Sequence, residues 1–225
     1  MAKERTQFLS GYLADVFAKE DPQLASLMSR AVAEGLPDIS VSPETGKLLS
    51  ILARLAGGHG GARQAVEVGT LGGYSAIWLV RGMAPGGKLT TIELNPKHAD
   101  FAAREFARAG VSARIQIRRG PAIEQLKVMA KTMPPSSIDL LFLDAVKTEY
   151  SEYFAIMRPL IRANGLVIAD NILGSKTWWM DDAPGTSADR DAVDQFNRMV
   201  AADVGFESVG IPVGHGILVA RKIGT

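Results

Sequence analysis

From residue 64 onward, short apolar runs alternate with longer segments in which apolar residues recur every three or four positions. The short runs are typical of buried strands, and the longer segments are typical of amphipathic helices. Repeated strand–helix units build a parallel sheet with helices on both faces. We therefore predict a doubly wound α/β fold with these strands: Gln64–Val68, Lys88–Glu93, Arg114–Arg119, Ile138–Leu143, Gly165–Ala169, Phe206–Ile211 and Ile217–Arg221.

Two local features refine this sheet. The turn at residues 212–216 is short and contains two glycines, and it favours an antiparallel hairpin of the last two strands. The helix before the fifth strand is expected to continue through Ile161, because Asn164 and Gly165 provide its stop signal.

The first 60 residues carry helical periodicity instead of strand signals. Apolar residues recur at helical spacing from Phe8 to Phe17 and from Leu24 to Val32, where Gly35 ends the pattern. A third helix begins after Ser42, a typical N-cap residue that is followed by a proline. No linker or repeat follows, so we predict one domain, with a helical cap in residues 1–60 and the sheet in residues 61–225.

The composition excludes several classes of protein. Hydrophobic residues make up 47% and charged residues 22% of the 225 positions, as in ordinary globular proteins. The 25 Lys+Arg residues nearly balance the 24 Asp+Glu residues, which argues against a dedicated nucleic-acid-binding protein. The chain has no cysteine, no apolar run that is long enough to span a bilayer and no signal-peptide pattern. We therefore expect a cytoplasmic protein that binds neither membranes nor nucleic acid.

The loop after the first strand is the first candidate site. A strand, a glycine-rich turn and a helix form the usual order of a nucleotide site, although such turns also occur without any ligand. The glycine spacing, Glu67-x-Gly69-x-x-Gly72-Gly73, differs from that of dinucleotide-binding loops. The carboxylate of Glu67 opposes a pyrophosphate but suits a ligand with a cationic amine.

Glu93 ends the second strand, where an acidic residue commonly binds ribose hydroxyls. Its alternative role is that of a solvated strand-end carboxylate or a helix cap. A ribose combined with a cationic, phosphate-free tail describes S-adenosylmethionine, which we predict as the cofactor.

A second candidate site follows the fourth and fifth strands. Asp144 ends the fourth strand, and Asp170 and Asn171 end the fifth. In the common order 3-2-1-4-5 these strands are neighbours, so the three side chains converge. Two close carboxylates repel each other unless a cation lies between them, and oxygen ligands favour Mg²⁺, with Ca²⁺ or Mn²⁺ as alternatives. The other interpretation is that both acids only cap turns or helices.

Lys147 lies three residues after Asp144. Near a cation and partly buried, a lysine has a lowered pKa and can act as a general base. Alternatively, Lys147 is an exposed residue in the first turn of a helix, although a positive charge is unfavourable there.

Aromatic residues and histidines give weaker signals. Trp178 and Trp179 are consistent with an aromatic substrate wall or with ordinary packing. His59 and His98 are expected at the surface, His215 in a structural or exposed role, and Asp181 and Asp182 in solvent.

Taken together, these motifs resemble the cation-dependent class I O-methyltransferases, similar to catechol and caffeoyl-coenzyme A O-methyltransferases and their bacterial relatives. The resemblance runs from about Ile39 to Lys222. It rests on the helix start at residues 42–46, the loop at 67–75, Glu93, and the segments 120–122, 143–147, 170–171 and 212–216. It implies a Rossmann-like methyltransferase sheet of order 3-2-1-4-5-7-6.

The resemblance also implies a role for each candidate residue. Residues near the methionine end of the cofactor would be Val41, Gly69 and Ser75, with Asp144 close to its amine. Glu93 would bind the ribose, and Ala122 would contact the adenine edge. The metal ligands would be Asp144, Asp170 and Asn171, and the base would be Lys147.

Four positions depart from the family pattern: Ser40, Pro121, Val146 and His215. Pro121 and Val146 each replace an acidic residue, so an adenine contact is lost and the surroundings of Lys147 are less acidic. None of the four is an expected metal ligand.

The leading hypothesis is methyl transfer from S-adenosylmethionine to one hydroxyl of a catechol-type phenol, by a homodimer. The first alternative is methylation of a hydroxylated tRNA base, for which Arg114, Arg118 and Arg119 would form a basic face. The second is a non-catalytic nucleotide-binding or oxidoreductase module, which the missing G-x-G-x-x-G spacing disfavours.

Overall fold

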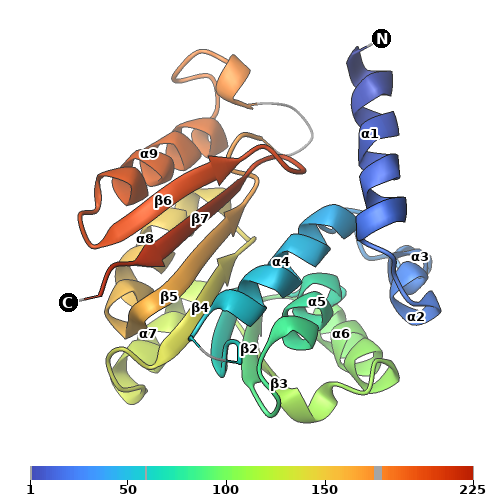
Figure 1. Ribbon diagram of the computed structural model, residues 1–225, viewed down its shortest axis with the longest axis horizontal. Coiled ribbons are helices and arrows are strands. Elements are labelled where there is room, and N and C mark those ends of the chain that lie inside the picture. The colour runs from blue at the N-terminus through green and yellow to red at the C-terminus, as the bar shows by residue number, and fades with distance from the viewer. Residues whose placement is uncertain (1, 59, 175–178, 225) are drawn as a thin grey trace.

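The computed structural model describes residues 2–58, 60–174 and 179–224. This part of the chain forms a seven-stranded sheet with the strand order β3-β2-β1-β4-β5-β7-β6 (Figure 1). Strands β1 to β5 are parallel, and β7 pairs antiparallel with both β5 and β6. Both the predicted order and the closing hairpin are therefore confirmed. The strands are β1 Gln64–Val68, β2 Lys88–Glu93, β3 Ile115–Arg119, β4 Ile138–Leu143, β5 Ile161–Asp170, β6 Phe206–Ile211 and β7 Ile217–Lys222.

Helices cover both faces of the sheet (Figure 1). One apolar core lies under α4, α5 and α6, and the other lies under α7, α8 and α9. None of the described helices has the length and apolar character that crossing a membrane requires. The helices are α1 Ala2–Phe17, α2 Pro22–Ala25, α3 Leu27–Ala33, α4 Pro43–Leu55, α5 Tyr74–Gly82, α6 Pro96–Arg108, α7 Ala122–Thr132, α8 Tyr150–Met157 and α9 Ala188–Ala202.

Two predicted boundaries are wrong. The helix expected to reach Ile161 ends at Met157, and β5 begins at Ile161, four residues before the predicted start. Ile161 pairs with Ile138 of β4, and the register shifts before the regular pairing of the two strands. Pairing with β4 therefore overrides the local turn signal at Asn164, whose φ of 64° lies in the left-handed region.

The helix predicted across Leu24 to Val32 is divided at Ser26 into α2 and α3. The Ser26 hydroxyl donates a hydrogen bond to the carbonyl of Pro22 (2.5 Å), which competes with the helical pattern. By contrast, the predicted N-cap at Ser42 is confirmed, because its hydroxyl accepts a bond from the amide of Thr45.

The register brings the carboxyl ends of β1, β2, β4 and β5 to one edge of the sheet. Val68 pairs with Ile92 on one side and with Leu143 on the other, and Leu143 pairs with Ala169. The residues that follow these strands therefore share one edge, as expected for a ligand site in an open α/β sheet.

Candidate active site

The loop after β1 has an unusual backbone in three of five positions. Gly69 has a φ of 101°, Leu71 of 48° and Gly73 of 84°. A Cβ atom on Gly69 would lie 2.0 Å from the carbonyl oxygen of Asp144. Glycine is therefore required at position 69 both by the backbone angle and by the close approach of β4.

Glu67 lies beneath this loop and is fully buried. Its two carboxylate oxygens accept hydrogen bonds from the hydroxyls of Ser75 and Thr91, each at 2.6 Å. Burial raises the pKa of Glu67 to about 7 in spite of these two donors. The carboxyl group therefore ties the end of β1 to the start of α5 through Ser75 and to β2 through Thr91.

Glu93 is buried and holds the same loop from the other side. One of its oxygens accepts bonds from the backbone amides of Thr70 (3.2 Å) and Leu71 (2.8 Å), and the other accepts from Asn95 (2.9 Å). The side chain is thus not a solvated strand end. His98, expected at the surface, is half-buried, and its Nδ1 lies 3.6 Å from Glu93.

The three predicted metal ligands lie together. The Nδ2 atom of Asn171 is 3.0 Å from Asp144 Oδ1 and 3.1 Å from Asp170 Oδ2. Burial raises the pKa of Asp170 to about 7, and the neighbouring Asp144 carboxylate adds to the rise. The two carboxylates therefore carry the mutual repulsion that a cation relieves.

This donor set fits a hard divalent cation, because it combines two carboxylates with an amide and contains neither sulfur nor imidazole. The Asn171 amide nitrogen now faces both acids, so a cation bound there would require the amide to turn and present its oxygen. Among the residues that the structure describes, no group of three or more His, Cys, Asp or Glu side chains has a metal-binding arrangement. The Asp144 set contains only two such side chains, because its third member is an asparagine.

Lys147 is directed into the site. Its side chain is only 10% exposed, so the interpretation as an exposed lysine is wrong. The Nζ atom donates to Asp144 Oδ1 (2.9 Å) and to the hydroxyl of Tyr150 (2.6 Å). Burial lowers the pKa of Lys147, but Tyr150 and Asp144 outweigh it, so the pKa is raised. The protein groups alone therefore raise the pKa of Lys147, whereas the lowered pKa expected from the sequence assumes a nearby cation.

Tyr150 belongs to the site, although helical periodicity indicates only that it is an apolar-face residue of a helix. It is fully buried, and its hydroxyl lies 3.1 Å from the carbonyl of Leu143 and 3.2 Å from that of Asp170. Burial raises the pKa of Tyr150, so the hydroxyl stays protonated and donates to one of these carbonyls while it accepts from Lys147. The sequence signal for this contact is the position of Tyr150 three residues after Lys147, because residues three apart on a helix are neighbours.

The remaining candidates lie at the borders of this edge or outside it. Val41 is buried in the same core as Tyr74, and Ala122 begins α7. His215 is exposed in the hairpin turn, where its carbonyl accepts a bond from the amide of Leu173. Trp179 begins a short 3-10 helix, and Asp181 and Asp182 are exposed. Trp178 and His59 lie outside the described residues.

Comparisons with known proteins identify similar chains. The family model described as O-methyltransferase matches residues 14–223. A catechol O-methyltransferase of Niastella koreensis is 34% identical over 214 residues, which cover 93% of this chain and 94% of the relative. A catechol O-methyltransferase of Mycobacterium tuberculosis is 36% identical over 184 residues, 81% and 80% of the two chains.

Solved structures agree with this similarity. An O-methyltransferase from Streptomyces achromogenes involved in tomaymycin synthesis, in complex with SAM, superposes with a TM-score of 0.88 at 33% identity. The match covers 100% of both chains. An O-methyltransferase from Bacillus cereus in complex with SAH gives a TM-score of 0.86 at 30% identity, over 95% and 96% of the chains.

Proposed function

The chain belongs to the O-methyltransferase family and depends on S-adenosylmethionine, and from this premise we propose that its acceptor is a catechol-type phenol methylated with the help of a divalent cation. The observation that carries this proposal is the convergence of Asp144, Asp170, Asn171 and Lys147 at the edge of the sheet that holds the loop. The catechol class is supported by the names of the two relatives from Niastella koreensis and Mycobacterium tuberculosis.

In this proposal the cofactor lies along the loop after β1. Gly69 allows its close approach, and Ser75 and Val41 border its methionine end. A bound cationic amine would favour the ionised form of Glu67, whose carboxyl group is bonded to Ser75. Glu93 fixes the backbone amides of the loop and binds the ribose, and Ala122 borders the adenine. S-adenosylmethionine supplies an electrophilic methyl group, so that an O–C bond forms while the S–C bond breaks.

Asp144, Asp170 and Asn171 would hold the cation, and the bound cation would lower the pKa of a chelated phenol, which is about 10 in water. Lys147 would accept the phenol proton at Nζ in its neutral form, so Nζ must first release its own proton. The Asp144 carboxylate now stabilises the charged form of Lys147, and a cation held by the same carboxylate would weaken this stabilisation and favour the neutral form. Tyr150 holds Nζ in place during this exchange.

The contacts of two arginines weigh against the tRNA alternative. Arg119 pairs with Asp100 at 2.6 Å, and Arg114 donates to the carbonyls of Gly87 and Ala84. These two guanidinium groups have partners within the protein, which favours a small phenol over tRNA as the acceptor.

Methyl transfer from labelled S-adenosylmethionine tests the proposal. We expect product with catechol and with hydroxycinnamates that carry vicinal hydroxyls, but not with resorcinol, whose hydroxyls are not adjacent. Activity should disappear in excess EDTA and return with Mg²⁺. Full activity in EDTA would contradict the metal, and incorporation into total tRNA instead of catechols would contradict the acceptor.

A binding measurement separates the metal from turnover. Calorimetric titration with Mn²⁺ should detect one site in the wild-type protein, and Asp170→Asn should weaken it. Equal binding by both proteins would show that Asp170 is not a ligand.

A further inference from the structure

Residues 20–33, which we call the α2–α3 segment, are tied to the two helices that follow the strands of the cofactor edge. The hydroxyl of Tyr74, at the start of α5, donates to Glu20 (2.7 Å). Arg81, near the end of α5, pairs with Asp21 at 2.5 Å. The third connection runs to α6, which begins three residues after Glu93. The segment therefore bridges both helices that border the loop.

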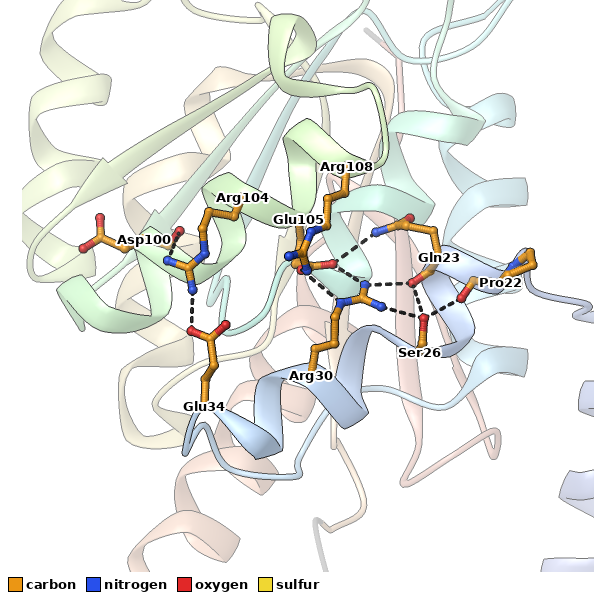
Figure 2. Close-up of polar contacts among 9 residues, drawn as sticks. All are labelled: Pro22, Gln23, Ser26, Arg30, Glu34, Asp100, Arg104, Glu105 and Arg108. Carbon is orange, nitrogen blue, oxygen red and sulfur yellow. Dashed lines mark hydrogen bonds and ion pairs between the residues drawn. The ribbon is translucent and has the colours of Figure 1, made fainter.

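The connection to α6 is an ionic cluster around the buried carboxylate of Glu105 (Figure 2). The Glu105 side chain is 1% exposed and accepts bonds from Gln23 (3.2 Å), from Arg108 (2.6 Å) and from two nitrogens of Arg30. Burial alone would raise the pKa of Glu105, but Arg30 outweighs it and the pKa is lowered. Glu105 is therefore a charged carboxylate whose burial depends on its partners.

On its apolar side the α2–α3 segment packs against the cofactor loop. Leu27 and Ala31 of α3 are fully buried, and a Cβ atom on Gly72 would lie 3.2 Å from Leu27 and 3.7 Å from Ala31. From α6, Phe106 approaches Gly73 even more closely, because a Cβ there would lie 2.4 Å from its ring. The loop is thus enclosed between α3 and α6.

The loop needs such support because its backbone is strained. Leu71 has a positive φ, which is unfavourable for a residue with a side chain, and it persists only where the surroundings determine it. Glu93 supplies hydrogen bonds on the strand side, and the packing of α3 and α6 supplies contacts on the other side.

We propose that Arg30 and Glu105 are positioning residues for the cofactor: their ion pair holds α3 on α6 and thereby keeps the loop at residues 69–75 in the conformation that binds S-adenosylmethionine. Neither residue belongs to the proposed cofactor site itself. This inference rests on the proposed placement of the cofactor at that loop. When the pair is broken, the loop samples other conformations, and the apparent affinity falls by the fraction of time it spends in the competent one.

The experiment compares Arg30→Met and the milder Arg30→Lys with the wild-type protein. We expect Arg30→Met to raise the Kd for S-adenosylhomocysteine about tenfold and Arg30→Lys to raise it less. Hydrogen exchange of the amides at residues 69–75 should speed up in parallel. With S-adenosylmethionine the KM should rise while kcat at saturation stays near the wild-type value, because the reacting groups are unchanged.

A matched control variant distinguishes a specific effect on the loop from a general loss of stability. Asp203 pairs with Arg158 through two bonds of 2.6 and 2.7 Å at the opposite edge of the sheet, where β5 begins. Asp203→Asn should lower the thermal midpoint without changing the Kd or the exchange of residues 69–75. The inference would be overturned if the Kd rose equally in Asp203→Asn, or if it stayed at the wild-type value in Arg30→Met. Either result would leave the proposed cofactor placement intact. A wild-type protein that does not bind S-adenosylhomocysteine would overturn the cofactor placement as well.

Discussion

Gly69 lies where the turn after β1 meets the end of β4, and its lack of a side chain is a steric requirement. Gly69→Ala should cost about 3 kcal/mol of unfolding free energy or abolish cofactor binding, since the methyl group collides with the Asp144 carbonyl. Gly86→Ala is the control: Gly86 also has a positive φ, of 77°, but a Cβ there meets no atom within 4 Å. Urea unfolding should show that the control loses about 1 kcal/mol of unfolding free energy. Equal losses of unfolding free energy in the two variants would show that glycine is required at position 69 only for its positive φ and not for the close approach of Asp144.

Tyr150 and Tyr153 allow a test of how the base is held. Both are buried tyrosines of α8, but the Tyr150 hydroxyl contacts Lys147, whereas that of Tyr153 donates to Glu149. We expect Tyr150→Phe to lower kcat about tenfold, because a displaced base transfers the proton less efficiently. Tyr153→Phe should keep the wild-type kcat in the same assay. A reduced kcat in both variants would indicate a general effect of α8 on the site.

Glu67 gives the protein a specific dependence on pH. Its pKa is raised from 4.5 to about 7 in the folded state, so the folded state binds more protons than the unfolded state between these values. The stabilisation from the protonated form is present below pH 4.5 and is lost as the pH rises through 7. The loss amounts to about 3 kcal/mol.

Glu67→Gln should remove this part of the pH dependence. In thermal unfolding without ligands, the wild-type midpoint should fall between pH 5 and pH 8, and the variant should fall less. Asp170, whose pKa is also raised to about 7, leaves a residual slope in the variant. Identical slopes for both proteins would contradict a neutral Glu67 in the folded state.

The sequence was sufficient to place Asp144, Asp170 and Asn171 together, because parallel strands end at a common edge. It was not sufficient to find the hydrogen-bond partners of these groups. Whether Tyr150 meets Lys147 depends on side-chain rotamers and on the turn after β4, which periodicity does not encode. The lowered Lys147 pKa was expected beside a bound cation and stays a prediction; among the protein groups alone, the Tyr150 contact and the ion pair to Asp144 outweigh burial and raise the pKa.

The central strands were predicted to within one residue because each is a short apolar run bounded by clear turn signals. The start of β5 was predicted four residues too late, since residues 161–165 contain Asn and Gly and locally resemble a turn. Only pairing with Ile138 makes this stretch a strand. The division of α2 from α3 at Ser26 was missed because the apolar spacing continues across it.

Helix α6 depends on its N-cap, and this dependence is measurable. The side chain of Asn95 accepts a bond from the amide of Lys97 at 2.9 Å. Asn95→Ala should lower the unfolding free energy by about 1 kcal/mol, as for other lost caps. Asn95→Asp keeps an acceptor oxygen and should retain most of the stability in the same urea titration. If both variants lose the same amount, the cap bond is not the cause.

Across the whole molecule, the sheet and its two helical layers form the core, whereas α1 extends away from them (Figure 1). Much of the apolar surface of α1 is exposed, and its large exposed side chains are Phe8, Leu9, Tyr12, Leu13, Val16 and Phe17. A single helix with this much uncovered apolar surface is typical of an association surface. It therefore supports the homodimer expected from the family resemblance, which stays a prediction.

The prediction is that α1 forms the contact between two copies of the chain. Light scattering after size exclusion should give twice the mass of one chain for the wild-type protein. The double variant Tyr12→Lys/Val16→Lys places two charges on the apolar surface, and we expect it to elute as a monomer with unchanged circular dichroism. Asp15→Asn, an exposed polar position on the same helix, should remain dimeric. A monomeric wild-type protein, or a dimeric double variant, would show that α1 has another role.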